Sequence, residues 1–423
     1  MHVTEQWLYF LWEEILPGLE QITTSCNKKI RIISPGFRNF STGPDYFNAR
    51  IEIDRIQWAG NVEIHVKTSD WNKHYHDYDS SYSTVILHVV WENDETVSES
   101  HLENIFLLEL KNFISAEHLD ACHQWMHFAK GTLPCSEHFS LLNDMECCSW
   151  LEKMSVERLE ERVLLLKKKF EFFNYDWNQL LYSLLLESFG FHVNSIPCFQ
   201  LSVRVPLSVL LKECDSLFRL DTLLLCTSGL VYELPHGSYR HHVIQEYEFL
   251  KQKYSLDTMS ERTWKCSGIR PANHPMVRLL QFSRMFFRLS DTFRHFHPAP
   301  DDFSVRDFLN DMFNPEDFRH EEIKIPLPGN DSKKLIVLNG WSLFYFFYGL
   351  ETGQEYFRML AMDMQQSLSP EKNFKTRLFS RFPLKKSSAF LTQGMIHLFN
   401  SRCRKKMCME CYFGRKIMKQ KII

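Results

Sequence analysis

The chain has 423 residues, of which 44% are hydrophobic and 24% charged, with a net charge of −3. These values are typical of a soluble globular protein with two or three domains. The most apolar run, residues 336–350, is too short and too polar to span a bilayer, so we expect no membrane partner. The first residues form no basic leader, and the twelve cysteines show no disulfide framework. We therefore expect a cytoplasmic protein with reduced thiols.

Charge is distributed unevenly along the chain. Residues 1–110 contain 8 Lys and Arg against 17 Asp and Glu, a net charge of −9, which leaves +6 for the remainder. Residues 401–423 contain eight basic residues and one acid, Glu410. An acidic front segment does not attract polyanions over its whole surface. Any contact with DNA or RNA is therefore expected at the basic tail or in a focused groove.

The front of the chain, residues 1–115, is predicted to form an α/β domain. Large apolar residues share one face of a helix over residues 5–16, which Pro17 and Gly18 end. Polar and aromatic residues 69–83 are long enough for a crossover between parallel strands. Alternating and β-branched runs predict strands over residues 29–33, 46–53, 61–67, 84–90 and 105–110. Alternation predicts that the second of these strands points the following side chains inward: Phe47, Ala49, Ile51 and Ile53.

After residue 115 the pattern becomes helical, and the fold class is α+β. We expect a helical domain over residues 116–330 and a helical C-terminal region, residues 331–423, that ends in a basic tail with cysteines. A long amphipathic helix runs from about residue 151 to 173. Asp176 caps the next helix, which Gly190 stops. Further helices are predicted near residues 205–214, 217–229, 239–253, 275–289, 341–366 and 386–400.

The first candidate site joins Asp45, which opens one strand, to the neighbouring strand. Along that strand Asn61, Glu63, His65 and Lys67 share one face. Mg²⁺ or Mn²⁺ takes one or two carboxylates and keeps room for phosphate oxygens. A nearby Lys or His can then orient or deprotonate an attacking water. The alternative interpretation is a solvated strand face in an antiparallel hairpin.

The second candidate site is the histidine-rich stretch over residues 70–77. His74 and His76, with nearby carboxylates, are able to ligate Zn²⁺, Mn²⁺ or Fe²⁺. The same residues, together with Trp71, could instead line a cleft and bind a substrate. His88 follows within an apolar strand, where a histidine is more often a hydrogen-bonded core residue than a ligand.

Cysteines in the basic tail form the third candidate site. Cys403, Cys408 and Cys411 are close enough in sequence to hold zinc or an iron–sulfur cluster if a fourth ligand comes from elsewhere. Cys135 and Cys266 are the candidates for that fourth position. Three free cysteines on a terminal helix remain the alternative.

A rigid turn at residues 270–275 is the fourth candidate. Arg270 at its start could reach a phosphate, although a structural turn is the favoured interpretation. The chain contains no phosphate-binding P-loop, dinucleotide glycine fingerprint, nucleophile-elbow serine or His-Glu-x-x-His motif.

Several segments along the chain form characteristic strings. They are residues 43–49, 58–65, 69–71, 85–90, 270–273 and 370–373, together with His74, His76, Asp79, Tyr82, Cys403, Cys408, Cys411 and Gly414. These strings resemble an uncharacterised bacterial family, the domain-of-unknown-function family 2851. The resemblance runs nearly end to end and implies no particular activity.

The front domain also resembles the PD-(D/E)xK nucleases, which have the restriction-endonuclease-like fold with a mixed sheet. By this resemblance Asp45 and Glu63 are the metal carboxylates, and His65 or Lys67 is the basic partner. His65 stands where the family pattern has lysine. The cysteines that follow this domain in sequence also resemble those of nucleases whose fold is stabilised by an iron–sulfur cluster, although the spacing here differs.

Three functions follow as hypotheses. The first is a metal-dependent nuclease or phosphodiesterase that acts on DNA or RNA at Asp45 and Glu63. The second is a binding scaffold, for nucleic acid or protein, that kept a nuclease fold and lost the chemistry. The third is a transition-metal hydrolase that uses His65, His74 and His76, with His88 as a further candidate.

Overall fold

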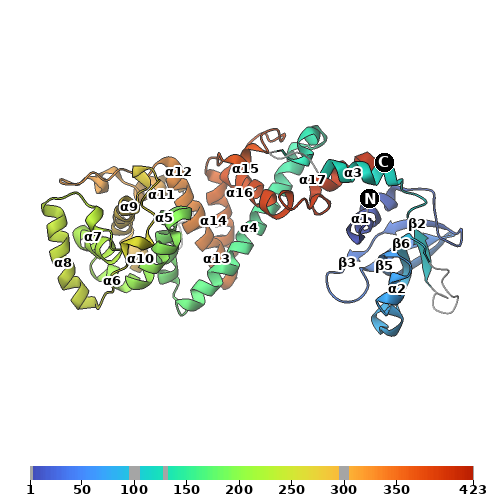
Figure 1. Cartoon of the computed structure of the whole chain (residues 1–423), viewed down its shortest axis with the longest axis horizontal. Helices are drawn as coiled ribbons and strands as arrows, with labels where there is room; N and C mark the ends of the chain where they lie inside the picture. The colour runs from blue at the N-terminus through green and yellow to red at the C-terminus, as the bar shows by residue number, and fades with distance from the viewer. Residues whose placement is uncertain (1–2, 95–104, 127–131, 295–303, 423) are drawn as a thin grey trace. The chain divides into compact units, whose positions relative to one another are not determined.

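The computed structural model describes residues 3–94, 105–126, 132–294 and 304–422 (Figure 1). The chain divides into two compact units. The first comprises Met1–Trp150, Phe374–Lys385 and Ile396–Ile423, and the second comprises Leu151–Asn373 and Lys386–Met395. These units do not coincide with the predicted segments 1–115, 116–330 and 331–423, because C-terminal residues pack with the front of the chain.

A mixed seven-stranded sheet forms the centre of the first unit. Its order is β1-β2-β4-β5-β6-β7, with β3 paired to β4. Pairing is antiparallel from β1 to β5 and parallel from β5 through β6 to β7. The strands are β1 (Ile22–Thr23), β2 (Lys29–Ser34), β3 (Phe37–Arg38), β4 (Tyr46–Ile53), β5 (Ile56–Lys67), β6 (Val85–Glu92) and β7 (Phe106–Glu109).

The sheet nearly closes on itself. The backbone N–H of Ser25, just after β1, donates to Leu107 O of β7 at 2.9 Å. The Trp58 ring of β5 packs edge-on against Phe106 with centroids 5.1 Å apart. All five predicted strands are confirmed because their alternating or β-branched runs suit a sheet that is buried on at least one face.

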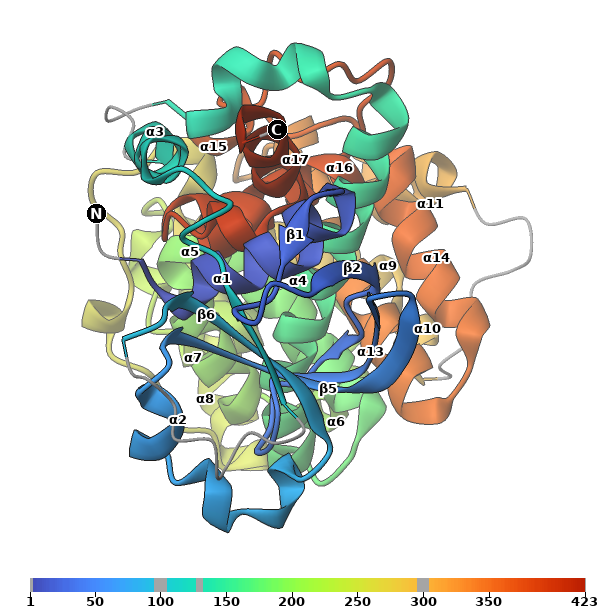
Figure 2. The ribbon, with the colours of Figure 1, turned by 90° about the vertical axis from the view of Figure 1, so that its right-hand side faces the viewer.

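The predicted first helix is confirmed and covers one face of the sheet. Helix α1 (Glu5–Phe10) packs across β5 and β6 (Figure 2) and continues as a π-helical turn, η1 (Leu11–Ile15). Trp12 on this turn is fully buried, and its indole N–H donates to Pro35 O at 3.1 Å. Burial of this apolar face stabilises the sheet.

One side of β4 differs from the prediction. Ala49, Ile51 and Ile53 are buried as expected, whereas Phe47 is 37% exposed and Tyr46 is buried in its place. The register shifts between Tyr46 and Ala49, where Asn48 has a φ of 55°. An extra residue in a strand reverses which side chains face the core. The prediction for Phe47 is therefore wrong because alternation does not reveal a bulge.

We predict that Gly36→Ala destabilises the first unit by about 1–3 kcal/mol. Gly36 has a φ of +84°, and a Cβ there would collide with Phe47 O and lie 2.8 Å from Ala49 N. Urea unfolding monitored by circular dichroism measures the change. Gly18→Ala is the matched control because a Cβ at Gly18 meets nothing within 4 Å. Equal stability of the two variants would contradict the prediction.

The second unit is mainly helical, so the α+β class is confirmed. Helix α4 (Asp144–Phe172) begins in the first unit and continues into the second. The other helices of the second unit are α5 (Trp177–Arg204), α6 (Leu207–Lys212), α7 (Leu217–Thr227), α8 (Ser238–Tyr254), α9 (Pro275–Arg288), α10 (Ser290–Arg294), α11 (Val305–Met312), α12 (Asn330–Ile336), α13 (Ser342–Thr352) and α14 (Glu355–Ser367).

Two glycines act differently from the prediction. The helix expected over residues 341–366 is two helices, because Gly353 has a φ of +70° and ends α13. Conversely, the helix expected to stop at Gly190 bends at Phe191 and continues to Arg204. A Cβ at Gly190 would lie 2.8 Å from Cys198 Sγ, so this glycine permits close packing at the bend.

Five further α-helices complete the description. Four belong to the first unit: α2 (Asp70–Lys73), α3 (Ala116–Met126), α15 (Phe374–Arg377) and α17 (Tyr412–Ile422). The fifth, α16 (Ala389–Leu398), runs from the second unit into the first. Helix α17 buries Ile417 and Met418 in the core of the first unit. Within the described ranges, none of the helices has the length and apolar character needed to cross a membrane.

Candidate metal centre

Strand β5 separates the core from the candidate site. Val62 and Ile64 are buried in the apolar core of the first unit, and Glu63 and His65 point to the opposite face. Glu63 and His65 are nevertheless only 5% and 2% exposed. The predicted alternation is confirmed for these four side chains, and two polar groups are thereby held in a largely dry site.

The crossover after β5 brings two more histidines to this face. His65 Nε2 lies 3.1 Å from His74 Nδ1, 3.3 Å from His76 Nε2 and 3.4 Å from Glu63 Oε1. His76 Nε2 lies 3.3 Å from Glu63 Oε1. His74 follows helix α2, and His76 opens the 3₁₀ turn η3 (His76–Tyr78). The crossover thus folds back over the strand that it leaves.

Hydrogen bonds alone do not explain these contacts. An imidazole nitrogen carries either one hydrogen or one lone pair, yet His65 Nε2 faces three neighbouring nitrogen or oxygen atoms. Ligand bonds of about 2.0–2.1 Å in a tetrahedron place ligand atoms about 3.3–3.4 Å apart. The observed separations of 3.1–3.4 Å match that geometry. The ligand atoms of His65, His74 and His76 all lie within 4.8 Å of one another.

A second layer of residues holds these imidazoles. His65 Nδ1 lies 2.9 Å from Nε2 of His88, which is fully buried in β6. If Nδ1 carries the hydrogen and donates to His88, Nε2 keeps its lone pair for a metal. Trp71 packs against His65, His76 and His88, with centroids between 5.1 and 6.5 Å. Tyr82 stacks on His76 at 3.8 Å.

Asp45 and Glu63 are brought together through the backbone of Asp45. The Asp45 backbone N–H donates to Glu63 Oε2 at 3.0 Å, and this bond leaves Oε1 for the histidines. The Asp45 carboxylate accepts the Ile64 N–H at 2.9 Å and the Tyr9 hydroxyl at 2.9 Å. Asp45 therefore orients Glu63 and is itself anchored from α1.

Burial controls the protonation of this site. Burial, and then the charge of Asp45, raises the pKa of Glu63 to about 9. Burial also raises the pKa of Asp45. Burial, followed by the neighbouring histidines, lowers the pKa of His65 to about 2, and burial lowers the pKa of His88 to about 3. At neutral pH His65 and His88 are therefore uncharged, which is the state a metal ligand requires.

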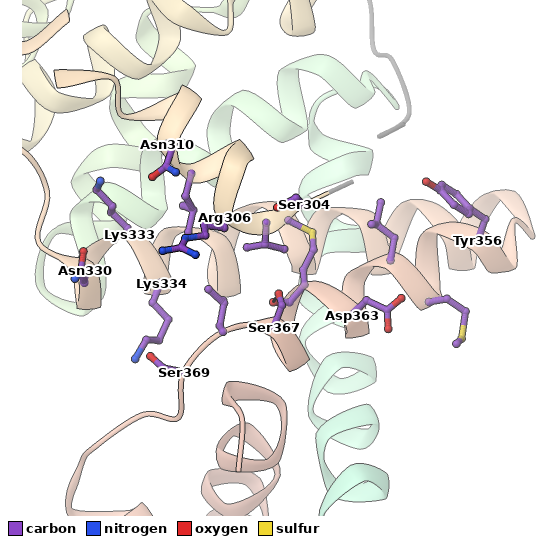
Figure 3. Close-up of a pocket in the computed structure, with 16 residues that line it drawn as sticks. Ser304, Arg306, Asn310, Asn330, Lys333, Lys334, Tyr356, Asp363, Ser367 and Ser369 are labelled. Carbon is purple, nitrogen blue, oxygen red and sulfur yellow. Dashed lines mark hydrogen bonds between the residues drawn. The ribbon is translucent and has the colours of Figure 1, made fainter. Parts of the chain in front are cut away.

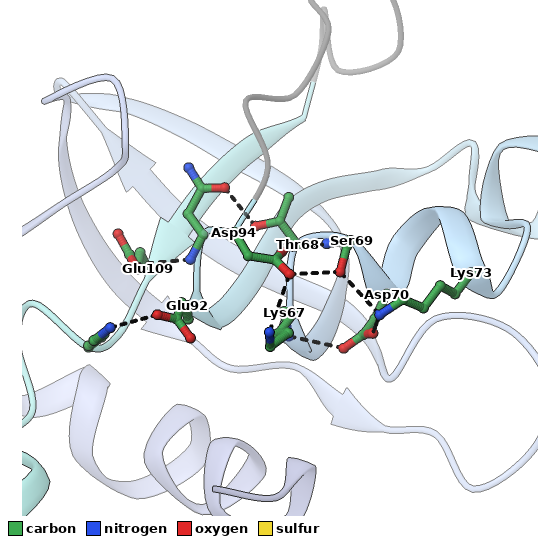
Figure 4. Close-up of polar contacts among 10 residues, drawn as sticks. Lys67, Thr68, Ser69, Asp70, Lys73, Glu92, Asp94 and Glu109 are labelled. Carbon is green, nitrogen blue, oxygen red and sulfur yellow. Dashed lines mark hydrogen bonds and ion pairs between the residues drawn. The ribbon is translucent and has the colours of Figure 1, made fainter.

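Lys67 lies in a separate surface network. Its Nζ lies 3.6 Å from Asp94 Oδ2, which also accepts the Ser69 hydroxyl at 2.9 Å (Figure 4). The Lys67 backbone N–H donates to Asp70 Oδ2 at 3.1 Å. Lys73 extends the network through Asp70 at 2.8 Å. The predicted basic partner is therefore paired with other acids.

The remaining predicted residues lie elsewhere. Arg270 is exposed in the second unit, where its carbonyl accepts the Asn273 N–H and forms the predicted turn. Cys403, Cys408 and Cys411 line one cavity of the first unit together with Cys135. Cys266, the other candidate for the fourth ligand, lies in the second unit.

Three residues near the site, Glu5, Tyr9 and Arg38, carry no functional signal in the sequence. Burial and the charge of Asp45 raise the pKa of Glu5, and Tyr9 bonds to Asp45 directly. The guanidinium of Arg38 on β3 lies 4.2 Å from the centre of the Tyr9 ring and 5.3 Å from that of Phe40. Helical spacing identifies the buried face of α1 but does not indicate what its other face contacts.

A cavity of about 930 Å³ in the second unit also carries no sequence signal (Figure 3). Arg306, Lys333 and Lys334 lie toward one end, and Tyr356 and Asp363 lie toward the other. These residues come from three different helices, α11, α12 and α14, and form no motif in sequence.

The fold and the site define an α+β protein with a buried cluster of histidines and carboxyl groups on a mixed sheet. The chain belongs to the family described as "Protein of unknown function (DUF2851)", which matches residues 5–374. The family resemblance is confirmed over that range, and the cysteines of the tail lie beyond it. No match was found among curated proteins or among solved structures.

Proposed function

We propose that this protein is a metal-dependent hydrolase with a transition-metal centre at Glu63, His65, His74 and His76. One observation carries the proposal: His65 Nε2 lies 3.1–3.4 Å from potential ligand atoms of the other three side chains, and His76 Nε2 lies 3.3 Å from Glu63 Oε1. The His88 partner of His65 adds support, because metal-ligating histidines usually have such a second contact.

The donor set favours a transition metal over Mg²⁺. Imidazole nitrogens suit zinc, iron and similar ions, whereas Mg²⁺ prefers oxygen ligands and water. Mn²⁺ binds carboxylate oxygens readily and is compatible with a set of both nitrogen and oxygen ligands. Among the hypotheses from sequence, this geometry favours the histidine-rich hydrolase over a centre made of Asp45 and Glu63 alone.

Each residue then has a distinct task. A bound ion would polarise the substrate oxygen and activate a water molecule. Glu63 supplies the anionic ligand, and the Asp45 N–H keeps its Oε1 directed at the histidines. We assign to the Asp45 carboxyl, whose pKa is raised by burial, the role of accepting a proton from the attacking water.

A phosphodiester in single-stranded nucleic acid is the substrate class we propose. Arg38 supplies a positive charge beside Asp45, and the β3 segment carries the exposed rings of Phe37 and Phe40. Tyr75 and Tyr78 on the crossover are exposed as well. Exposed rings with an adjacent arginine can stack on bases while the cation contacts phosphate.

Strand topology supports the resemblance to PD-(D/E)xK nucleases in part. Helix α1, the antiparallel strands β2, β4 and β5, a crossover and the parallel strand β6 follow in the order of that fold. Asp45 precedes β4 and Glu63 lies on β5, as in the motif. The departures are His65 in the lysine position, the pairing of Lys67 with Asp94 and the near closure of the sheet.

The test compares metals and substrates. Metal-free protein is loaded with Zn²⁺, Mn²⁺, Fe²⁺ or Mg²⁺ and incubated with labelled single-stranded and duplex DNA, RNA and a small phosphodiester. Bound metal is quantified by mass spectrometry. We expect stoichiometric binding of a transition metal and cleavage of single strands. A protein that binds none of these ions and cleaves none of these substrates would instead be a binding scaffold.

Metal affinity is expected to increase with pH. The raised pKa of Glu63, about 9, keeps its carboxyl protonated at pH 7 without metal. Binding must displace this proton, so the apparent affinity should rise about tenfold per pH unit up to roughly pH 9. His65 does not compete for protons in this range because its pKa is lowered to about 2. Chelator competition between pH 6 and 9 measures the slope. A flat profile in the wild type would contradict the prediction.

A further inference from the structure

Four cysteines from distant parts of the sequence line one cavity of the first unit. Cys135 lies on the 3₁₀ segment η5 (Pro134–Leu141), and Cys403 ends the π-helical turn η11 (Phe399–Cys403). Cys408 and Cys411 flank the turn that leads into α17. All four side chains line the same cavity. The four thiols are therefore neighbours.

The surroundings suit a group held by thiolates. Trp125, Pro134 and Met407 provide an apolar lining, and all twelve cysteines of the chain are free of disulfides. Gly414 allows the start of α17 to approach Cys408, because a Cβ at this glycine would collide with Cys408 O. Low polarity and limited access for solvent are features of protein sites that bind clusters.

One of the four cysteines stands at the start of a helix. Cys411 directly precedes α17, an 11-residue helix, so it lies at the positive end of the helix dipole. This position stabilises a thiolate and adjusts the potential of an iron–sulfur centre.

The number of thiols suits a cluster. Four cysteines line one cavity, and four cysteines are the ligand set of [4Fe–4S] clusters. A single tetrahedral zinc ion is the competing occupant, since it also takes four thiolates.

We infer that Cys135, Cys403, Cys408 and Cys411 bind a [4Fe–4S] cluster in the first unit. The site is separate from the histidine centre and does not depend on the proposed hydrolase activity.

The role that the geometry supports is structural. The cluster would join η5 to the C-terminal segment that ends in α17. That helix contacts the N-terminal helix, because Arg415 forms ion pairs with Glu13 at 2.6 Å and with Glu14 at 2.9 Å. Glu13 in turn accepts the Tyr46 hydroxyl at 2.7 Å. The cluster would therefore hold the last helix against the element that covers the sheet.

The test measures the composition of the full chain purified without oxygen. We expect about four iron atoms and about four acid-labile sulfides per chain, with a broad visible absorption that dithionite bleaches. Stoichiometric zinc without sulfide, or protein with neither metal, would overturn the inference. These measurements use the wild type and do not require any variant to fold.

Variants then assign the ligands. Cys135→Ser, Cys403→Ser, Cys408→Ser and Cys411→Ser are each expected to lose most of the iron and to unfold at lower temperature than the wild type. Cys26→Ser, at an exposed thiol of the same unit, and Cys266→Ser, in the second unit, should retain both iron and stability. Full iron content in Cys135→Ser would exclude it as the fourth ligand and overturn the assignment.

Discussion

Glu63→Gln is expected to lower the affinity for a transition metal by at least about a hundredfold and to abolish hydrolysis. Loss of residues that merely support a ligand costs about 10–100-fold in affinity, and Glu63 is the anionic ligand itself in the proposed centre. Glutamine keeps the shape of the side chain and can still accept the Asp45 N–H that Glu63 Oε2 accepts at 3.0 Å. Competition with a chelator gives the affinity, and single-turnover cleavage gives the rate.

His74→Ala tests the same centre at its exposed edge. His74 is exposed, so its replacement should preserve the fold, and its Nδ1 lies 3.1 Å from His65 Nε2. We expect a loss of affinity and rate comparable to that of Glu63→Gln. Retention of both metal and activity by the two variants would refute the centre.

Lys67→Met separates the two catalytic hypotheses. In a nuclease of the PD-(D/E)xK type, this lysine would substitute for the catalytic one, and its loss would abolish cleavage. In the histidine centre, the variant loses only an ion pair with Asp94 at the surface, so activity should change less than about threefold while stability falls by less than about 1 kcal/mol. Loss of cleavage with full metal binding in Lys67→Met would favour the nuclease motif.

The largest effect on stability is expected from Arg284→Met in the second unit. Arg284 on α9 and Asp221 on α7 form an ion pair whose side chains are 0% and 1% exposed. Asp221 also accepts the Ser283 hydroxyl at 2.5 Å and the Tyr239 hydroxyl at 2.7 Å. Removal of the arginine leaves a buried carboxylate without its counter-charge, which costs about 3–5 kcal/mol. We expect the melting temperature of this unit to fall by roughly 10 °C, as measured by calorimetry.

Two further variants make this test specific. Arg288→Met on the same helix removes an exposed pair with Asp311, so it should cost less than about 1 kcal/mol. The double variant Arg284→Met/Asp221→Leu should recover most of the loss, because an apolar pair leaves no buried charge uncompensated. If Arg284→Met melts at the same temperature as Arg288→Met, the buried Arg284–Asp221 pair contributes less to stability than predicted.

Local patterns predict the strands well where burial repeats regularly. The β-branched run of β6 and the alternation in β5 identify both strands, because each side chain's environment follows from its position in the strand. The same rule gives the wrong face at Phe47, where the bulge at Asn48 adds a residue. Bulges arise from pairing with a partner strand, and the strand's own sequence does not contain that information.

The candidate site, like the strands, is predictable from the sequence only in part. Spacing predicts that Glu63 and His65 share a face, and it marks His74 and His76 as potential ligands. It does not predict that the crossover folds back until His74 lies against His65, or that Lys67 turns to Asp94. Tyr9 enters the site from a helix whose periodicity indicates only its buried face.

The sequence by itself determined the fold class, most of the elements and the residues that could carry chemistry, because each depends on near neighbours in the chain. Tertiary structure decided which of these residues meet. Cys135 lines the same cavity as Cys403, although 268 positions separate them in sequence, and Arg415 reaches Glu13 across almost the whole chain. Such contacts depend on how all the apolar faces of a unit are buried at once, and no local pattern records that outcome.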